Sequence, residues 1–224
     1  MSKLHIFDMD GTLLPGSASL ELSRHMGQLE AVEAIEERWS RGEVGHVEYY
    51  EISLPLWTGL SDEDVEEVFR AIAWVDRIPE VWADIARRGE RSAVISLSPQ
   101  FFAERLLRWG LHSAHGAEVE AGVFPDPSLV LTPDSKVEIA EELMQRYGVG
   151  ASDCVAYGDS VSDVPLFDLL SNTVAVNGTE ALRRAAAASY EGADLWAAYE
   201  MGRDLLARSA EEADELLECG KRPG

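Results

Sequence analysis

Short, mostly apolar runs recur along most of the chain and constrain its fold more than any other feature. The first is LHIF, residues 4–7, and later ones are RSAVIS, DCVAYGD and NTVAVN, which end at Ser96, Asp159 and Asn177. Continuous apolar runs of this length are typical of parallel strands that are buried on both faces. They predict a parallel sheet at the centre of the protein.

Helical patterns separate these runs. PEVWADIARRG, PQFFAERLLRWG and PDSKVEIAEELMQRYG each have a proline near the start and a glycine at the end. Proline is favoured in the first turn of a helix, and glycine is favoured just after the last turn. Strands that alternate with helices of this length predict an α/β fold, a Rossmann-like parallel sheet with helices on both faces.

Two segments interrupt the alternation. The first, residues 16–76, is helical in pattern, and we predict that it forms an inserted helical-bundle cap on a core of residues 1–15 and 77–224. It carries the aromatic side chains of Trp39, Tyr49, Tyr50, Trp57, Phe69 and Trp74, and we interpret most of these as filling its own interior. The second, AEVEAGVFPDPSLVLT, has Gly122 between two β-prone runs and predicts a hairpin or small antiparallel flap. The tail from Gly192 predicts one or two more helices, with a frayed acidic end.

The chain of 224 residues carries 41 acidic and 19 basic residues, a formal net charge of −22. This charge argues against non-specific binding to nucleic acid or to an anionic membrane, because both select positive surfaces. The first residues run directly into a strand without a signal-peptide pattern, and no apolar run approaches a membrane span. We therefore expect a cytoplasmic protein, a monomer or homodimer, with no nucleic-acid or membrane partner.

Polar side chains stand where the predicted strands end. Asp8 and Asp10 follow the first strand, Ser96 ends the second, Asp159 follows a third, and Lys136 lies one turn into the helix after Pro133. Because ligands of open parallel sheets bind outside the carboxyl ends of the strands, we expect these groups to meet at one edge.

The residue types at this edge suit phosphoryl transfer. Carboxylate oxygens of Asp8, Asp10 and Asp159 are ligands that Mg²⁺ prefers, and the metal would offset their mutual repulsion. Ser96, Lys136 and nearby backbone N–H groups can bind the oxygens of a phosphoryl group. One carboxylate can be the nucleophile, and a second carboxylate two residues on can move protons.

The motifs DMDGT at Asp8–Thr12, Ser96 after an apolar strand, Lys136, and GDSVSD at Gly158–Asp163 resemble, in order and spacing, those of the haloacid dehalogenase (HAD) superfamily phosphatases. The resemblance implies that Asp8 is the nucleophile and Asp10 the general acid and base. It implies metal ligation by Asp8, Asp159 and the Asp10 backbone carbonyl, with Asp163 at or beside the metal. The expected phosphate-binding residues are Ser96, Leu97, Lys136, Gly11 and Thr12.

The helical insert and the sequence SLSP look like those of the branch with a C1 cap that includes phosphoserine phosphatases. The chain departs from that branch in the cap. Ser17 aligns near the Glu, and Ser53 near the Arg, with which such enzymes grip serine, although Glu21 could substitute for the Glu. No arginine occurs between Arg41 and Arg70. The resemblance therefore implies a Mg²⁺-dependent hydrolase of a small phosphomonoester, with phosphoserine in doubt as the substrate.

Several alternatives stay open on the residues alone. A phosphotransferase or phosphomutase could use the same fold. A receiver-like phospho-acceptor would also use clustered acids and a lysine, although receivers are about half this length. A serine hydrolase with Ser160 as nucleophile needs G-x-S-x-G, but Ser162 stands where the second glycine belongs. We interpret Ser98 as a cap for the helix that begins at Pro99.

Overall fold

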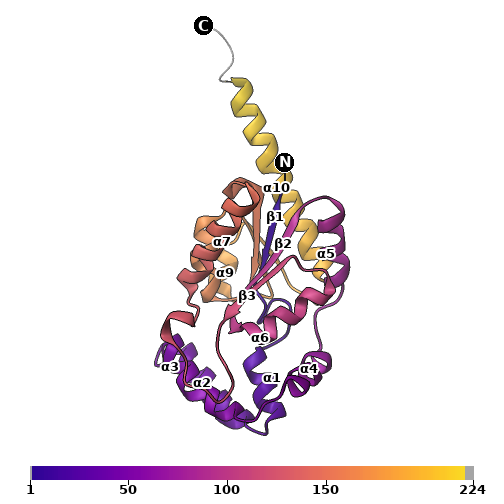
Figure 1. Cartoon of the computed structure of the whole chain (residues 1–224). Helices are drawn as coiled ribbons and strands as arrows, with labels where there is room; N and C mark the ends of the chain where they lie inside the picture. The colour runs from indigo at the N-terminus through magenta and orange to yellow at the C-terminus, as the bar shows by residue number, and fades with distance from the viewer. Residues whose placement is uncertain (1, 220–224) are drawn as a thin grey trace.

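The computed structural model describes residues 2–219, and a six-stranded parallel sheet forms its centre (Figure 1). The strand order is β3-β2-β1-β4-β5-β6, so the first strand of the chain lies in the middle of the sheet. All neighbouring strands are parallel: β1 (Leu4–Phe7), β2 (Arg91–Pro99), β3 (Ser113–Ala117), β4 (Cys154–Gly158), β5 (Asn172–Val176) and β6 (Ala188–Tyr190). The predicted fold class is confirmed.

Helices cover both faces of this sheet (Figure 1). Side chains of α5 (Ile78–Arg87) and α10 (Leu195–Cys219) share one apolar cluster with Phe7 of β1. Ile6 points to the opposite face and belongs to a second cluster with α7 (Pro133–Tyr147), α8 (Val164–Leu169) and α9 (Glu180–Ala185). Successive side chains of a strand point to opposite faces, so an apolar run buries both.

The helix expected over residues 99–110 is divided in the structure into α6 (Gln100–Ala103) and η2 (Glu104–Trp109), which is a 3₁₀ helix. Further 3₁₀ turns are η3 (Pro127–Leu129), η4 (Ala151–Asp153) and η5 (Val161–Asp163). The sequence patterns also missed the short edge strands β3 and β6. Both are poor in large apolar residues, since an edge strand buries less of its surface than a central one.

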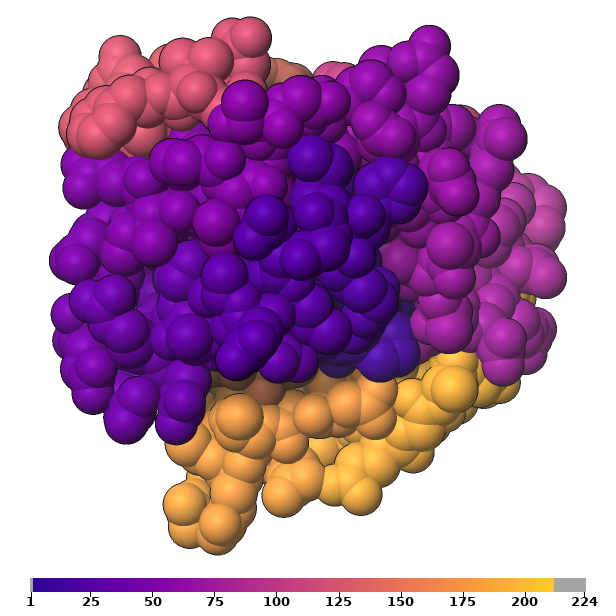
Figure 2. Space-filling model, turned by 90° about the horizontal axis from the view of Figure 1, so that it is seen from below, coloured from indigo at the N-terminus to yellow at the C-terminus, as the bar shows by residue number. Residues whose placement is uncertain are grey.

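The segment after β1 forms α1 (Ala18–His25), α2 (Leu29–Ser40), α3 (His46–Ser53), η1 (Leu54–Trp57) and α4 (Asp62–Ala71). These helices lie beyond the carboxyl ends of the strands (Figure 1) and cover that end of the molecule when it is seen from below (Figure 2). Trp57 and Phe69 are buried, and the ring of Phe69 lies 5.7 Å from that of Phe102 of α6. The helices of the insert therefore pack on the sheet domain; the boundaries 16 and 76 remain a prediction.

The hairpin expected around Gly122 is not formed, and that prediction was wrong. After β3 the chain makes turns, and the amide of Glu118 donates a hydrogen bond to the carbonyl of Leu129 at 3.0 Å. Pro125 and Pro127 have no N–H to donate to a strand ladder, which explains why the two β-prone runs do not pair. The amide of Gly122 instead donates to the carbonyl of Leu54, 2.9 Å away, so this segment rests against the insert.

The tail forms the single long helix α10, which extends beyond the sheet (Figure 1). The frayed end expected for this tail falls partly on residues 220–224, which lie outside the described residues. Within residues 2–219, no helix combines the length and apolarity that a membrane span requires. The cytoplasmic location remains a prediction.

Candidate active site

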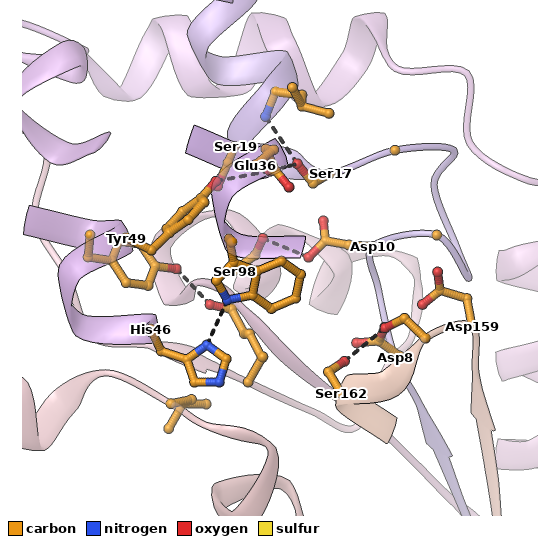
Figure 3. A pocket seen from close by; sticks show the side chains of 18 of the residues that line it. Asp8, Asp10, Ser17, Ser19, Glu36, His46, Tyr49, Ser98, Asp159 and Ser162 are labelled. Atoms are coloured by element: carbon orange, nitrogen blue, oxygen red, sulfur yellow. Dashed lines mark hydrogen bonds between the residues drawn. The ribbon is translucent and has the colours of Figure 1, made fainter. Parts of the chain in front are cut away.

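The polar residues at the strand ends meet at one cavity of about 330 Å³, between the sheet and the insert (Figure 3). Asp8 and Asp10 reach it from the end of β1, Asp159 from the end of β4, and Lys136 from the first turn of α7. Leu97 and Ser98 of β2 complete its floor. The strand-end argument thus placed Asp8, Asp10, Asp159 and Lys136 at one cavity, whereas Ser96 lies behind its wall. Their roles remain predictions.

Lys136 is buried between two carboxylates. Its Nζ lies 2.8 Å from Oδ1 of Asp8 and 2.6 Å from Oδ1 of Asp163. Burial alone would lower the pKa of Lys136, but the charges of Asp163 and Asp8 outweigh it and raise that pKa. The ammonium therefore stays protonated and can bind an anion beside Asp8.

Burial and the charge of Asp163 raise the pKa of Asp8 well above its usual range, against the attraction of Lys136. Burial raises the pKa of Asp159 to about 7, with a further contribution from Asp163. Carboxylates with raised pKa values, gathered in a cavity, are typical of sites that bind a cation or perform acid–base chemistry. A bound divalent cation would favour their ionised forms.

The side chain of Asp10 is held by three donors. The hydroxyls of Ser98 and Ser96 donate to Oδ2 over 2.7 and 3.0 Å, and the amide of Ala18 donates to Oδ1 over 2.7 Å. Burial raises the pKa of Asp10, while these hydrogen bonds lower it. The interpretation of Ser98 as a helix cap was wrong, because α6 has no side-chain cap and the hydroxyl faces Asp10.

Asp8, Asp159 and Asp163 each offer a carboxylate oxygen, and these oxygens lie within 4.8 Å of one another. Three clustered hard oxygen donors suit Mg²⁺ or another hard divalent cation, so the residues fit a metal. The carboxylate of Asp10 is not in this group and faces Ser96 and Ser98. Ligation by the backbone carbonyl of Asp10 remains a prediction.

Glycines make room for the carboxylates of this cluster. A Cβ on Gly11 would lie 2.1 Å from Oδ2 of Asp159, and Gly11 has φ +74°, where other residues are strained. A Cβ on Gly158 would lie 2.4 Å from the carboxyl carbon of Asp163. Asp163 also accepts hydrogen bonds from the amides of Asp159 and Ser160, at 3.0 and 3.2 Å. The motif glycines therefore allow the carboxylates to approach the backbone closely.

Of the other predicted phosphate-binding residues, two line the cavity and two lie behind its wall. Gly11 and Leu97 line the cavity. Ser96 and Thr12 are fully buried behind its wall. The hydroxyl of Ser96 points to Asp10, whereas that of Thr12 has no hydrogen-bond partner among the described residues.

The insert contributes residues that the sequence patterns did not single out. Glu36 of α2 accepts hydrogen bonds from the hydroxyls of Ser17 and Tyr49, at 2.8 and 2.9 Å (Figure 3). The sequence contains a pattern that could have identified Glu36. It follows the buried Val32 by four residues and therefore lies on the same face of the helix. An acidic residue on the inward face of an amphipathic helix marks a candidate site.

Trp39 and His46 lie side by side at the same wall. The indole N–H of Trp39 donates to Nδ1 of His46 over 3.0 Å. Burial, with the charge of Lys136, lowers the pKa of His46, so the ring is neutral and carries its proton on Nε2. Together with Tyr49 and Tyr50, these rings give the insert side of the cavity an aromatic wall.

Comparison with known proteins decides the family. Residues 6–168 match the model of the haloacid dehalogenase-like hydrolases. The chain belongs to this family. This HAD-like hydrolase is 29% identical over 198 residues to a phosphoserine phosphatase of Archaeoglobus fulgidus. The matched region covers 86% of this chain but only 58% of that protein. It is 25% identical over 201 residues to the phosphoserine phosphatase of Methanocaldococcus jannaschii, covering 86% of this chain and 94% of that one.

Solved structures of phosphoserine phosphatases also resemble this HAD-like hydrolase. A phospho-aspartyl intermediate analogue of phosphoserine phosphatase superposes with a TM-score of 0.74 at 25% identity, covering 87% of this chain and 95% of the other. The predicted resemblance to HAD phosphatases of the phosphoserine phosphatase branch is confirmed.

The positions at which we predicted a departure from the branch can now be located; the departure itself remains a prediction. Ser17 binds Glu36, and Ser53 is buried, without a hydrogen-bond partner for its hydroxyl among the described residues. Glu21 forms an ion pair with Arg24 and does not line the cavity. Glu21 therefore does not substitute for a serine-gripping Glu in this arrangement.

Proposed function

We propose that the protein is a Mg²⁺-dependent phosphatase that hydrolyses a small phosphomonoester through a phosphoryl group carried on Asp8. One observation carries the proposal. A buried carboxylate, Asp8, and a buried ammonium, Lys136, meet at the floor of a cavity beside a second carboxylate, Asp10, that three donors hold in place. Phosphoryl transfer needs such a nucleophile, charge neutralisation and a positioned proton donor.

In the first step, a carboxylate oxygen of Asp8 attacks the phosphorus atom. The bond between phosphorus and the ester oxygen breaks as the new bond forms. Asp10, in its protonated form, gives its proton to the departing oxygen, which leaves as an alcohol. The raised pKa of Asp10 favours this starting form, and Ser96 and Ser98 fix its orientation.

In the second step, the ionised Asp10 takes a proton from water. The hydroxide so formed attacks phosphorus, and the bond between phosphorus and the Asp8 oxygen breaks. Inorganic phosphate leaves, and both carboxylates return to their initial states. Lys136, whose Nζ lies 2.8 Å from Asp8, would offset the charge of the phosphoryl oxygens in both steps.

Asp8, Asp159 and Asp163 would hold the cation at or beside the phosphoryl group. When bound, Mg²⁺ would neutralise charge on the phosphoryl oxygens and on the clustered carboxylates. The insert lies over the end of the molecule that holds the cavity, and it contributes part of the cavity wall. Closure of the insert over a bound substrate would exclude water from the reacting groups. We propose accordingly that residues 16–76 act as the cap that contacts the leaving group.

The test is phosphate release from a panel of metabolite phosphomonoesters, in Mg²⁺ and in excess EDTA. Asp8→Asn, which keeps the size of the side chain, is the blank. Activity that needs Mg²⁺ and disappears in Asp8→Asn supports the proposal. Mg²⁺-independent activity, or turnover that survives in Asp8→Asn, would contradict it.

A further inference from the structure

Glu36, the acidic residue on the insert side of the cavity, has one carboxylate oxygen to which no described residue donates a hydrogen bond. Both hydrogen bonds to Glu36, from Ser17 and from Tyr49, end on Oε1. Among the described residues, no side chain or backbone group donates a hydrogen bond to Oε2, and Glu36 lines the cavity. The two donors thus fix the carboxylate and leave one oxygen for a ligand.

No basic side chain of the insert faces this carboxylate. Among the described residues that line the cavity, the only lysine or arginine is Lys136, which is already bound between Asp8 and Asp163. His46 is neutral because Trp39 donates to its Nδ1 and burial lowers its pKa. A half-buried carboxylate without a cation is costly, so a ligand that brings a positive charge would be favoured at this wall.

The rings around Glu36 suit the same ligand chemistry. Trp39, Tyr49 and Tyr50 line the cavity on the insert side, with the ring centroids of the two tyrosines 5.6 Å apart and their planes near perpendicular. Aromatic faces attract cations, including alkylated ammonium groups. A carboxylate on the leaving group would instead meet Glu36 with no arginine or lysine to bind it, which disfavours an amino acid.

We propose that the substrate is the phosphate monoester of an amino alcohol, whose ammonium group binds Oε2 of Glu36 and which carries no carboxylate. The inference rests on the proposed phosphatase function, since it names the leaving group of that reaction. Glu36 is then a specificity-determining residue, and Ser17 and Tyr49 are positioning residues that act through it.

The experiment compares matched phosphomonoesters. O-phosphoethanolamine, phosphocholine and histidinol phosphate carry the cation, n-propyl phosphate lacks it, and phosphoserine adds a carboxylate. The measured quantity is kcat/KM for each with Mg²⁺, together with the Kd of each for the Asp8→Asn protein by calorimetry. The first three compounds distinguish a primary ammonium, an alkylated ammonium and an imidazole-bearing amine as the source of the charge.

We expect at least one amino-alcohol phosphate to exceed both n-propyl phosphate and phosphoserine about tenfold or more in kcat/KM. Glu36→Gln should reduce this preference over n-propyl phosphate toward one. Tyr49→Phe, which keeps the ring but removes the donor to Oε1, should reduce the preference less. Glu37→Gln, on the exposed face of the same helix, is the matched control and should leave all values unchanged.

Equal hydrolysis of n-propyl phosphate and of every amino-alcohol phosphate, or a preference for phosphoserine, would overturn the inference and leave the phosphatase proposal standing. The binding arm separates the reverse case. If no compound is hydrolysed but the amino-alcohol phosphates bind more tightly than n-propyl phosphate in a Glu36-dependent way, the proposed reaction fails and the inference about this wall holds. Equal binding of all compounds would overturn the inference.

Discussion

The hydroxyl of Tyr50 donates a hydrogen bond to the backbone carbonyl of Leu97, 2.6 Å away. Tyr50 belongs to α3 of the insert, and Leu97 belongs to β2 beside Asp10. This bond joins the insert to the strand whose Ser96 and Ser98 orient Asp10. The position of the insert and the geometry of the reacting groups are therefore linked through this contact, as well as through the hydrogen bond from the amide of Ala18 to Asp10.

Tyr50→Phe tests this link. Removal of the hydroxyl leaves the carbonyl of Leu97 without this donor and costs about 1 kcal/mol of contact between insert and sheet. We expect KM for a phosphomonoester to rise several-fold and kcat to fall less. Steady-state kinetics measure both, and Tyr147→Phe on α7, remote from the cavity, is the control. An unchanged KM in Tyr50→Phe would show that the contact does not hold the insert in place.

Ser98→Ala tests the orientation of Asp10. The hydrogen bond from the Ser98 hydroxyl to Asp10 ends on a carboxylate, and such bonds contribute about 1.5–3 kcal/mol. If the whole contribution acts in the transition state, kcat/KM falls roughly ten- to a hundredfold. Phosphate-release kinetics measure the effect, with the exposed Ser128→Ala as control. Wild-type kcat/KM in Ser98→Ala would mean that Asp10 needs no such support.

Lys136→Met tests the charge balance of the site. Loss of the ammonium leaves Asp8 and Asp163 buried without their common cation, which typically costs about 3–5 kcal/mol. We expect a fall of this size in the free energy of unfolding, measured with urea in EDTA, and partial recovery in excess Mg²⁺.

The matched control for that variant is Lys3→Met. Lys3 pairs with Asp153 at 2.6 Å, but both side chains are partly exposed, so the change should cost about 1 kcal/mol or less. Equal effects of the two substitutions would contradict the view that Lys136 compensates buried charge.

His5 predicts a pH dependence of stability. Burial lowers the pKa of His5 from 6.5, although Glu90 lies 3.0 Å from its Nε2 and acts in the opposite direction. The unfolded chain then binds a proton more readily than the folded one, so folding stability is lost as the pH falls below about 6.5. The carboxyl pKa of Glu90 is itself lowered by its bonds to His5 and Arg203 against burial, so its contribution is lost at still lower pH.

The measurement is urea unfolding at pH 7.5 and pH 5.5. His5→Gln, which keeps a polar group but does not titrate, should lose less stability on acidification than the wild type. The titrating groups that do not contact His5 and the high net negative charge act on both proteins, so the difference between them reports His5 together with its partner Glu90. A larger loss in His5→Gln would contradict the stated sign.

The fold and the position of the site could be predicted because they follow from local patterns. Runs such as Leu4–Phe7 bury both faces of a strand, and parallel strands bring Asp8 and Asp159 to one edge whatever the lengths of the intervening segments. The edge strands β3 and β6 were not predicted, because they bury too little surface to require an apolar run.

The residues on the insert side of the site could not be predicted from local sequence patterns in the same way. Glu36 and Ser17 are 19 residues apart and meet only because α1 and α2 pack together, which no spacing in the sequence specifies. Ser98 was misread because a serine before Pro99 has the pattern of a cap, whereas its hydroxyl is directed by the position of Asp10. Contacts between distant segments depend on packing, and packing is a property of the folded chain.

Rapid acid quench during turnover tests the central claim most directly. The protein is mixed with substrate and Mg²⁺, quenched with acid and digested, and the masses of its peptides are measured. We predict that the peptide containing Asp8 gains the mass of one phosphoryl group, and that Asp8→Asn shows no such gain. A phosphoryl group found on another residue, or turnover that leaves every peptide unmodified at all quench times, would contradict the account.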